Sequence, residues 1–131
     1  MDIIEQYILE LEKDVKLDQF NVRDSQMRLP AYKHKWVGRL MRHKHEVVKL
    51  NQQKHTLKKA VADKIQSTST YKVSKPVAEK AAATHESIVD IVNKIDELNV
   101  VIEFLEKAER ILSSMTFDIK NLVEIMKLET T

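Results

Sequence analysis

Glycine and proline are almost absent, since the 131 residues contain one glycine and two prolines. Tight turns and two-residue strand hairpins depend on glycine, because it adopts the left-handed backbone conformation that other residues avoid. A β-rich chain needs more turn residues than this sequence offers. The composition suits long helices joined by few loops, and the length fits one domain. We therefore predict an all-α fold.

The N-terminal segment has the spacing of a short amphipathic helix. Apolar residues recur every three or four positions over residues 2–13, and Asp2 can cap the first turn. A helix this short is marginal alone, so we expect it to dock on another part of the chain. We predict irregular structure for residues 14–25.

A long helix follows, starting near Ser25 or Pro30 and running to about Gln66, with Gly38 as its one potential breaker. Pro30 suits a first turn, where its missing N–H has no partner to lose. The apolar residues form a single narrow stripe, which is typical of a helix that packs along one seam. Its members are Trp36, Leu40, Val47, Leu50, Leu57, Val61 and Ile65.

The second half of the chain repeats this arrangement. A linker rich in Ser and Thr spans residues 67–75, and Pro76 opens the next helix. A break is plausible at Ser113–Ser114, after which helical spacing continues. We predict a long antiparallel helical hairpin with a short N-terminal helix and an additional C-terminal helix. The heptad stripe of this half contains Ile88, Ile91, Ile95, Leu98, Ile102 and Leu105.

We expect one domain, 1–131, with an acidic N-terminal segment (1–27), a basic helix (28–66), the linker (67–75) and a helical oligomerisation region (76–131). A hairpin of helices is too thin to bury all of its apolar side chains, so self-association into a homo-oligomer is the natural solution. The residues predicted to mediate it are Ile91, Ile95, Leu98, Ile102 and Leu105.

Charge is distributed unevenly along the chain. Residues 28–64 hold eleven Lys and Arg against two acids, a net charge of +9 in a chain whose total is +2. Such a block predicts a polyanion ligand. No base-reading motif is present, so we expect contacts to phosphates with strong salt dependence. The candidate DNA-binding residues are Lys35, Arg39, Arg42, Lys54, Lys58, Lys59 and Lys64.

Trp36 has two interpretations. It could be a stacking platform for bases inside a cationic groove, or it could anchor the core, because Tyr32, Trp36 and Leu40 share a helix face. The period match favours the core. Four of the five histidines lie between residues 34 and 55, but none has a second histidine three or four residues away, so we predict no metal site.

Several functional classes are poorly supported. The chain has no cysteine and too little glycine for a phosphate-binding loop, and no nucleophile motif is present, so we predict no enzyme, no catalytic residue and no cofactor. No apolar run is long enough to span a membrane. The acidic N-terminus lacks the charge order of a signal peptide, and we expect a cytoplasmic protein.

The order of residues resembles the UvsY family, the recombination mediators of T-even-like phages. The resemblance lies in LEKDVKLD (11–18), YKHKW (32–36) and HKHEVVKLNQQKHTLKKAVADK (43–64), and covers about residues 9–64. It implies a ring-like homo-oligomer that binds single-stranded DNA. In the family, a Leu-x-Ala-Arg-Leu-like segment contributes a DNA-contacting lysine and arginine. Lys59 matches the lysine, whereas Val61 stands where the arginine is expected.

The resemblance implies a mediator that helps a RecA-like recombinase displace single-strand-binding protein and assemble on DNA. If the chain is phage-encoded, this takes place in the host cytoplasm. Two alternatives remain open from the residues alone. One is a coiled-coil scaffold whose basic helix docks an acidic protein, and the other is a protein that organises double-stranded DNA.

Overall fold

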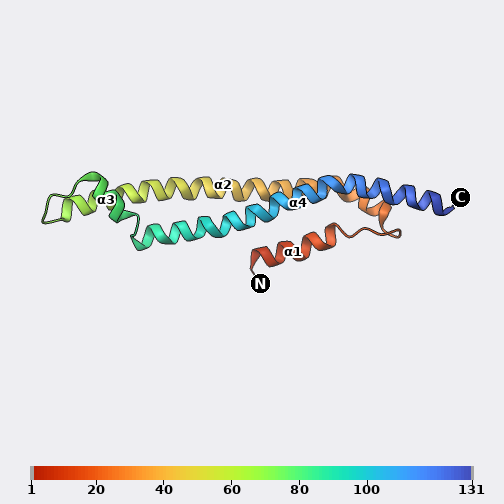
Figure 1. The fold of residues 1–131 in the computed structure, drawn as a ribbon, viewed down its shortest axis with the longest axis horizontal. Coiled ribbons are helices and arrows are strands. Elements are labelled where there is room, and N and C mark those ends of the chain that lie inside the picture. The colour runs from red at the N-terminus through yellow and green to blue at the C-terminus, as the bar shows by residue number, and fades with distance from the viewer. Residues whose placement is uncertain (1, 131) are drawn as a thin grey trace. The chain divides into compact units, whose positions relative to one another are not determined.

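The computed structural model describes residues 2–130, and all regular structure within that range is helical. Figure 1 shows the four helices. They are α1 (Ile3–Asp14), α2 (Val22–Thr68), α3 (Lys75–Ala82) and α4 (Glu86–Thr130). The predicted all-α class is confirmed. Over the same residues, no helix combines the length and apolarity that crossing a membrane requires.

Helix α1 begins where the sequence predicts. The Asp2 carboxylate accepts hydrogen bonds from the backbone N–H groups of Ile4, at 2.8 Å, and Glu5, at 3.2 Å. These bonds satisfy two donors that a helix start otherwise leaves without partners. The helix ends at Asp14, one residue beyond the predicted end.

Helix α2 starts earlier than predicted, at Val22, so residues 22–25 are helical rather than irregular. The reason is a compact turn before it. Asp18 accepts hydrogen bonds from the N–H groups of Phe20 and Asn21, while the Asn21 side chain accepts from Asp18 N–H at 2.7 Å. This turn fixes the entry of the chain into the helix. Pro30 consequently lies inside α2, not in its first turn.

The chain forms two compact units. The residues through Arg42 together with those from Val101 onward form the terminal unit, and His43–Val100 form the middle unit. In the terminal unit, α2 and α4 run antiparallel: Lys33 donates a hydrogen bond to Thr116 at 3.3 Å, while Trp36 contacts Phe104 further back along α4. The buried apolar residues of this unit are Leu11, Leu29, Trp36, Leu40, Val101, Ile102, Leu105, Ala108, Leu112, Met115 and Ile119.

The middle unit has a core of small side chains where α3 packs on α2. Ala62 of α2 and Ala78 and Ala82 of α3 are buried there. Alanine lets two helices approach closely, because it extends little beyond the backbone. The loop before α3 is tied to α2 by the Gln66 side chain, which donates a hydrogen bond to the carbonyl of Val73 at 3.1 Å.

The predicted third helix is divided in two. Residues 83–85 form a turn between α3 and α4. His85 Nδ1 lies 2.7 Å from Ser87 Oγ and accepts a hydrogen bond from Ser87 N–H, so this side chain caps the new helix. No glycine or proline marks the break, and the run Ala81–Ala83 favours helix, which explains why the sequence pattern conceals it.

Helix α4 continues without interruption to Thr130, so the expected break at Ser113–Ser114 and the separate C-terminal helix are wrong. Ser114 Oγ donates to the carbonyl of Ile111 at 2.8 Å, a bond that a serine makes within a helix without ending it. The extra short helix of the fold is instead α3.

The buried face of α4 predicts that truncating one of its side chains to alanine destabilises the protein far more than truncating an exposed side chain. Leu105 has no exposed surface, so Leu105→Ala should lower the free energy of unfolding by about 2–5 kcal/mol through the cavity it leaves. Met27→Ala, at an exposed position of α2, should change it by no more than about 0.5 kcal/mol. Urea denaturation at a fixed protein concentration checks both, and equal effects would contradict the assigned core.

Candidate nucleic-acid interface

Nine of the eleven Lys and Arg residues between 28 and 64 fall into two groups; the other two are Arg28, which pairs with Asp24, and Lys33, which donates a hydrogen bond to Thr116. The first group contacts α1. Lys35 Nζ lies 2.5 Å from an Asp14 carboxylate oxygen and 3.7 Å from one of Glu10. Arg39 pairs with Glu10 through both guanidinium N–H₂ groups. The acidic N-terminal helix therefore neutralises the early part of the basic block within the chain itself.

These ion pairs surround the only tryptophan. Trp36 is fully buried, and its indole N–H donates to Asp14 at 2.9 Å. The Lys35 ammonium lies 5.3 Å from the Trp36 ring centroid, and the Arg39 guanidinium lies 4.8 Å from it, both within the range of cation–π attraction. We call this group the Trp36 cluster; its members are Tyr7, Glu10, Asp14, Lys35, Trp36, Arg39 and Phe104.

The electrostatics of the Trp36 cluster fix its charged state. The pKa of Glu10 is lowered below its ordinary value of 4.5, chiefly because Arg39 donates hydrogen bonds to its carboxylate. Partial burial opposes this shift, while the positive charges of Arg39 and Lys35 add to it. The same hydrogen bond raises the pKa of Arg39. Both groups are therefore charged at neutral pH, and the ion pair attaches α1 to α2.

The second group of cations has no internal partner. Among residues 2–130, no carboxylate lies within 4.0 Å of any cationic nitrogen in this group. Its seven members are Arg42, Lys44, Lys49, Lys54, Lys58, Lys59 and Lys64, which we call the open cations. Seven unpaired positive charges on one stretch of helix leave a strong positive potential for an external anion.

The open cations differ in exposure. Arg42, Lys59 and Lys64 are exposed, whereas Lys54 and Lys58 are half-buried along the seam of the helix. Because successive helix residues turn by about 100°, the group is spread around α2 rather than aligned in one row. This arrangement suits contacts with a flexible chain of phosphates better than the reading of a rigid groove.

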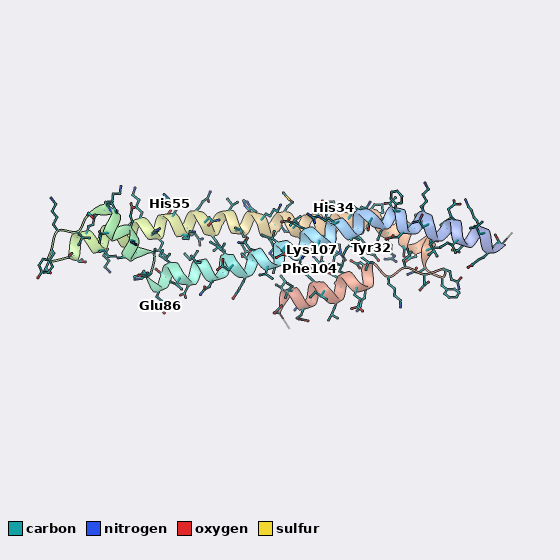
Figure 2. All side chains as sticks on the ribbon, viewed as in Figure 1. Tyr32, His34, His55, Glu86, Phe104 and Lys107 are labelled. Atoms are coloured by element: carbon teal, nitrogen blue, oxygen red, sulfur yellow. The ribbon has the colours of Figure 1, made fainter. Side chains whose placement is uncertain are left out.

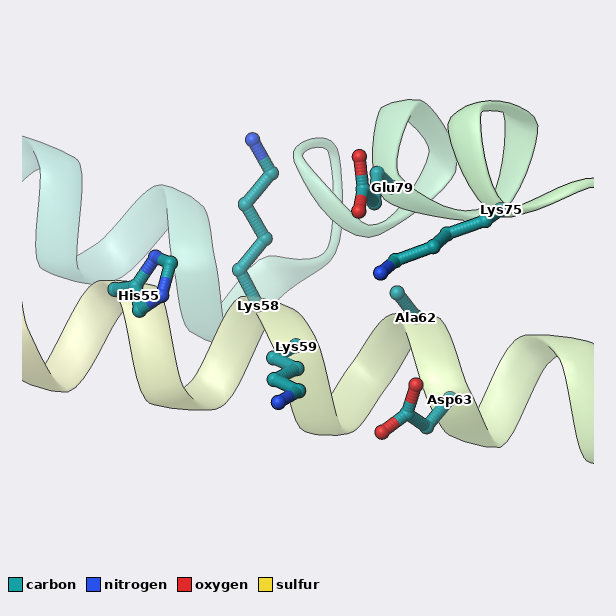
Figure 3. A pocket seen from close by; sticks show the side chains of 7 residues that line it. All are labelled: His55, Lys58, Lys59, Ala62, Asp63, Lys75 and Glu79. Atoms are coloured by element: carbon teal, nitrogen blue, oxygen red, sulfur yellow. The ribbon is translucent and has the colours of Figure 1, made fainter.

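Part of this surface is hollowed into a pocket in the middle unit, with a volume of about 330 Å³. Figure 3 shows its seven lining side chains. Lys75 and Glu79 come from α3, and the Lys75 side chain extends over Ala62. The residues contributed by α2 are His55, Lys58, Lys59, Ala62 and Asp63.

The structure thus separates the predicted DNA-binding residues. Lys35 and Arg39 belong to the Trp36 cluster, Lys58 and Lys59 line the pocket, and the remaining three are open cations elsewhere on α2. The sequence analysis did not include Lys75 among the DNA-binding residues. Pro76 marks Lys75 as lying at the start of a helix, but this does not indicate which surface the lysine joins. What the sequence could not show is that α3 folds back against α2.

The core interpretation of Trp36 is confirmed by its burial. A highly exposed aromatic residue occurs elsewhere, since 83% of Tyr71 in the loop before α3 is exposed. His34 and His55 project from different turns of α2 (Figure 2). Within residues 2–130, no group of three or more His, Asp or Glu side chains has the geometry to hold a metal ion.

The predicted oligomerisation stripe is mostly used within the protomer. Leu105 is fully buried, and Ile95 and Ile102 are each 8% exposed. Ile91 and Leu98 are half-buried. A second copy could reach the three buried side chains only by opening the protomer. The exposed apolar residues of α4 in the terminal unit are Ile111, Phe117, Ile125 and Leu128.

Residues 10–131 match the sequence family described as "Recombination, repair and ssDNA binding protein UvsY". Two crystal structures of the bacteriophage T4 recombination mediator protein UvsY, lattice types IV and II, each superpose with a TM-score of 0.82 at 19% identity. They cover 98% and 100% of this chain and 99% of each T4 chain. At this identity the likeness is one of fold. No curated protein sequence matches the chain significantly.

The ion pair of Glu10 predicts a pH-dependent contribution to stability. Because folding lowers the pKa of Glu10, the unfolded chain binds more protons below pH 4.5, and the stabilisation is lost as pH falls further. Glu10→Gln should therefore destabilise the protein at pH 7 and have a shrinking effect toward pH 3. Urea denaturation across this range measures the difference.

Glu12→Gln is the matched control, because Glu12 lies on the same helix and is exposed. Its effect on the free energy of unfolding at pH 7 should be small, because the Glu12 side chain is exposed. An effect of Glu10→Gln that does not change with pH would contradict the role of this ion pair.

Proposed function

The chain belongs to the UvsY family of recombination, repair and single-stranded DNA binding proteins, and we propose that it is a recombination mediator without catalytic activity. It binds single-stranded DNA and helps a RecA-like recombinase load onto DNA that single-strand-binding protein covers. The recombinase step rests on family membership alone. The DNA-binding step also has support in the chain's own residues.

The open cations are the observation that supports DNA binding. The acids of the chain neutralise Lys35 and Arg39 but none of the seven cations from Arg42 onward. Phosphates of a single strand can take the place of the missing carboxylates and release the counterions that otherwise surround both partners. Six of the seven are lysines, which act as point charges, so we expect affinity for the backbone with little reading of sequence.

The length of the interface fits a chain-like ligand. Within the middle unit, from Lys44 to Lys64, the helix rises by about 30 Å, at about 1.5 Å per residue. Several successive phosphates can contact a surface of that length. Lys35 and Arg39 are held by α1 in the structure, so we place them outside the interface and expect the open cations to dominate binding.

We further propose that the protein acts as a ring-like homo-oligomer. Many copies of a weak phosphate-binding surface bind one strand tightly, because each later contact forms within an assembled complex. Wrapping a strand around such an assembly would compete with single-strand-binding protein for the same phosphates. Phe117, 69% exposed, and Ile125, 52% exposed, are apolar side chains that a second copy could cover.

A paired substitution tests the interface. Lys58→Ala with Lys59→Ala should weaken binding of fluorescent oligo-dT and reduce the slope of log affinity against log salt by about 1.4, which is about 0.7 for each lost phosphate contact. Lys107→Ala with Lys127→Ala removes the same charge from α4, where both lysines already pair with glutamates. This control should leave the slope unchanged.

The outcomes of this titration separate the candidate functions. If the unmodified protein fails to bind oligo-dT at low salt, the proposal is wrong and a scaffold that docks an acidic protein becomes the better explanation. If both double variants lose the same oligo-dT affinity, binding responds to the total charge of the protein and not to a particular site. Competition by duplex DNA at equal strength would indicate a double-stranded ligand.

The assembly surface has its own test. Phe117→Asp with Ile125→Asp should lower the mass measured by sedimentation, because charges on an apolar contact oppose its burial. Asn121→Asp, exposed on the same helix between them, adds a charge and should preserve the mass. An unchanged mass in the double variant, with helicity retained, would move the contact to another face.

A further inference from the structure

We propose that the pocket between α2 and α3 binds one phosphodiester of single-stranded DNA, with Lys75 contributed by α3 and Lys58 and Lys59 contributed by α2. This inference rests on the proposed function and adds α3 to the interface, a helix that contains none of the cations predicted from the sequence. Three properties of the pocket support it, namely the way its wall is held, its charge and its composition.

The wall of the pocket is held by close packing. Ala78 of α3 has no exposed surface, and Ala62 of α2, in the same buried cluster, is 4% exposed. The hydrogen bond from the Gln66 side chain to the carbonyl of Val73 fixes the loop segment that leads into α3. Because the contacting side chains are small, α3 lies near enough to α2 for Lys75 to extend over the same pocket as Lys58 (Figure 3).

The charge of the pocket matches a single phosphodiester. Three lysines and two carboxylates line it, which leaves one net positive charge when His55 is neutral. A phosphodiester carries one negative charge. Asp63 and Glu79 line the same pocket, yet neither forms an ion pair with the lysines in the part of the chain that the structure describes. The ammonium groups are therefore available to a ligand.

The composition of the pocket also indicates how the ligand is held. It contains no arginine, so the planar two-bond recognition of phosphate is absent and the attraction is that of point charges. The two carboxylates limit the net attraction. Such a site grips a phosphate reversibly, which suits a protein that must later yield its strand to a recombinase.

The test compares two lysines of the same helix. Lys75 lines the pocket, whereas Lys80 is exposed on α3 outside it. In the full-length protein, Lys75→Ala should weaken oligo-dT binding and reduce the salt slope by about 0.7. Lys80→Ala should leave the slope as it is. Inorganic phosphate, added as competitor at constant ionic strength, tests whether an isolated anion occupies the same site.

A second pair of variants tests the wall itself. Ala78→Leu should push α3 away from α2 and weaken oligo-dT binding several-fold, while Ala81→Leu, at an exposed position of the same helix, should not. Circular dichroism confirms that helices remain in both. Glu79→Gln should have the opposite sign and tighten binding, because it removes a negative charge from the pocket.

The results distinguish the two levels of the proposal. If the unmodified protein binds oligo-dT with a steep salt slope and neither Lys75→Ala nor Ala78→Leu changes it, α3 is outside the interface and only this inference fails. If oligo-dT does not bind at all, the proposed function fails as well. Displacement by inorganic phosphate that Lys75→Ala does not affect would also overturn the inference.

Discussion

The contact of Asp14 with Lys35 and Trp36 is the interaction on which the rest of the structure depends. A buried carboxylate is costly unless it is paired and hydrogen-bonded, and Asp14 obtains both from two neighbouring residues of α2. This contact docks α1, which is too short to be stable alone. It also affects the charge pattern, because the acids of α1 neutralise Lys35 and Arg39 but none of the open cations.

The helices could be predicted because apolar spacing and the lack of turn residues are local properties. The start of α2 and the break before α4 could not be predicted from the sequence. Both depend on hydrogen bonds between side chains and the backbone, made by Asp18, Asn21 and His85, and neither is marked by glycine or proline. The partners of the candidate DNA-binding residues could not be predicted either. Lys35 and Arg39 meet partners 21 and 29 residues away, a separation at which no local pattern indicates contact.

The motifs that carry the family resemblance have a structural role in this chain. Asp14 lies in LEKDVKLD, and Lys35 and Trp36 lie in YKHKW, so the two motifs meet at the Trp36 cluster. The separation of 21 residues between Asp14 and Lys35 brings the end of α1 against one particular turn of α2. These two motifs therefore belong to the scaffold, while the third motif, residues 43–64, contains six of the seven open cations that we propose bind DNA.

Val61 shows how the scaffold and the binding surface affect each other. The resemblance places an arginine at this position, but here Val61 is partly buried and packs against the core formed by Ala62, Ala78 and Ala82. A charged side chain there would have to leave that core or be desolvated within it. The packing that holds α3 thus disfavours a cation at position 61 and, through the same contact, brings Lys75 to the pocket.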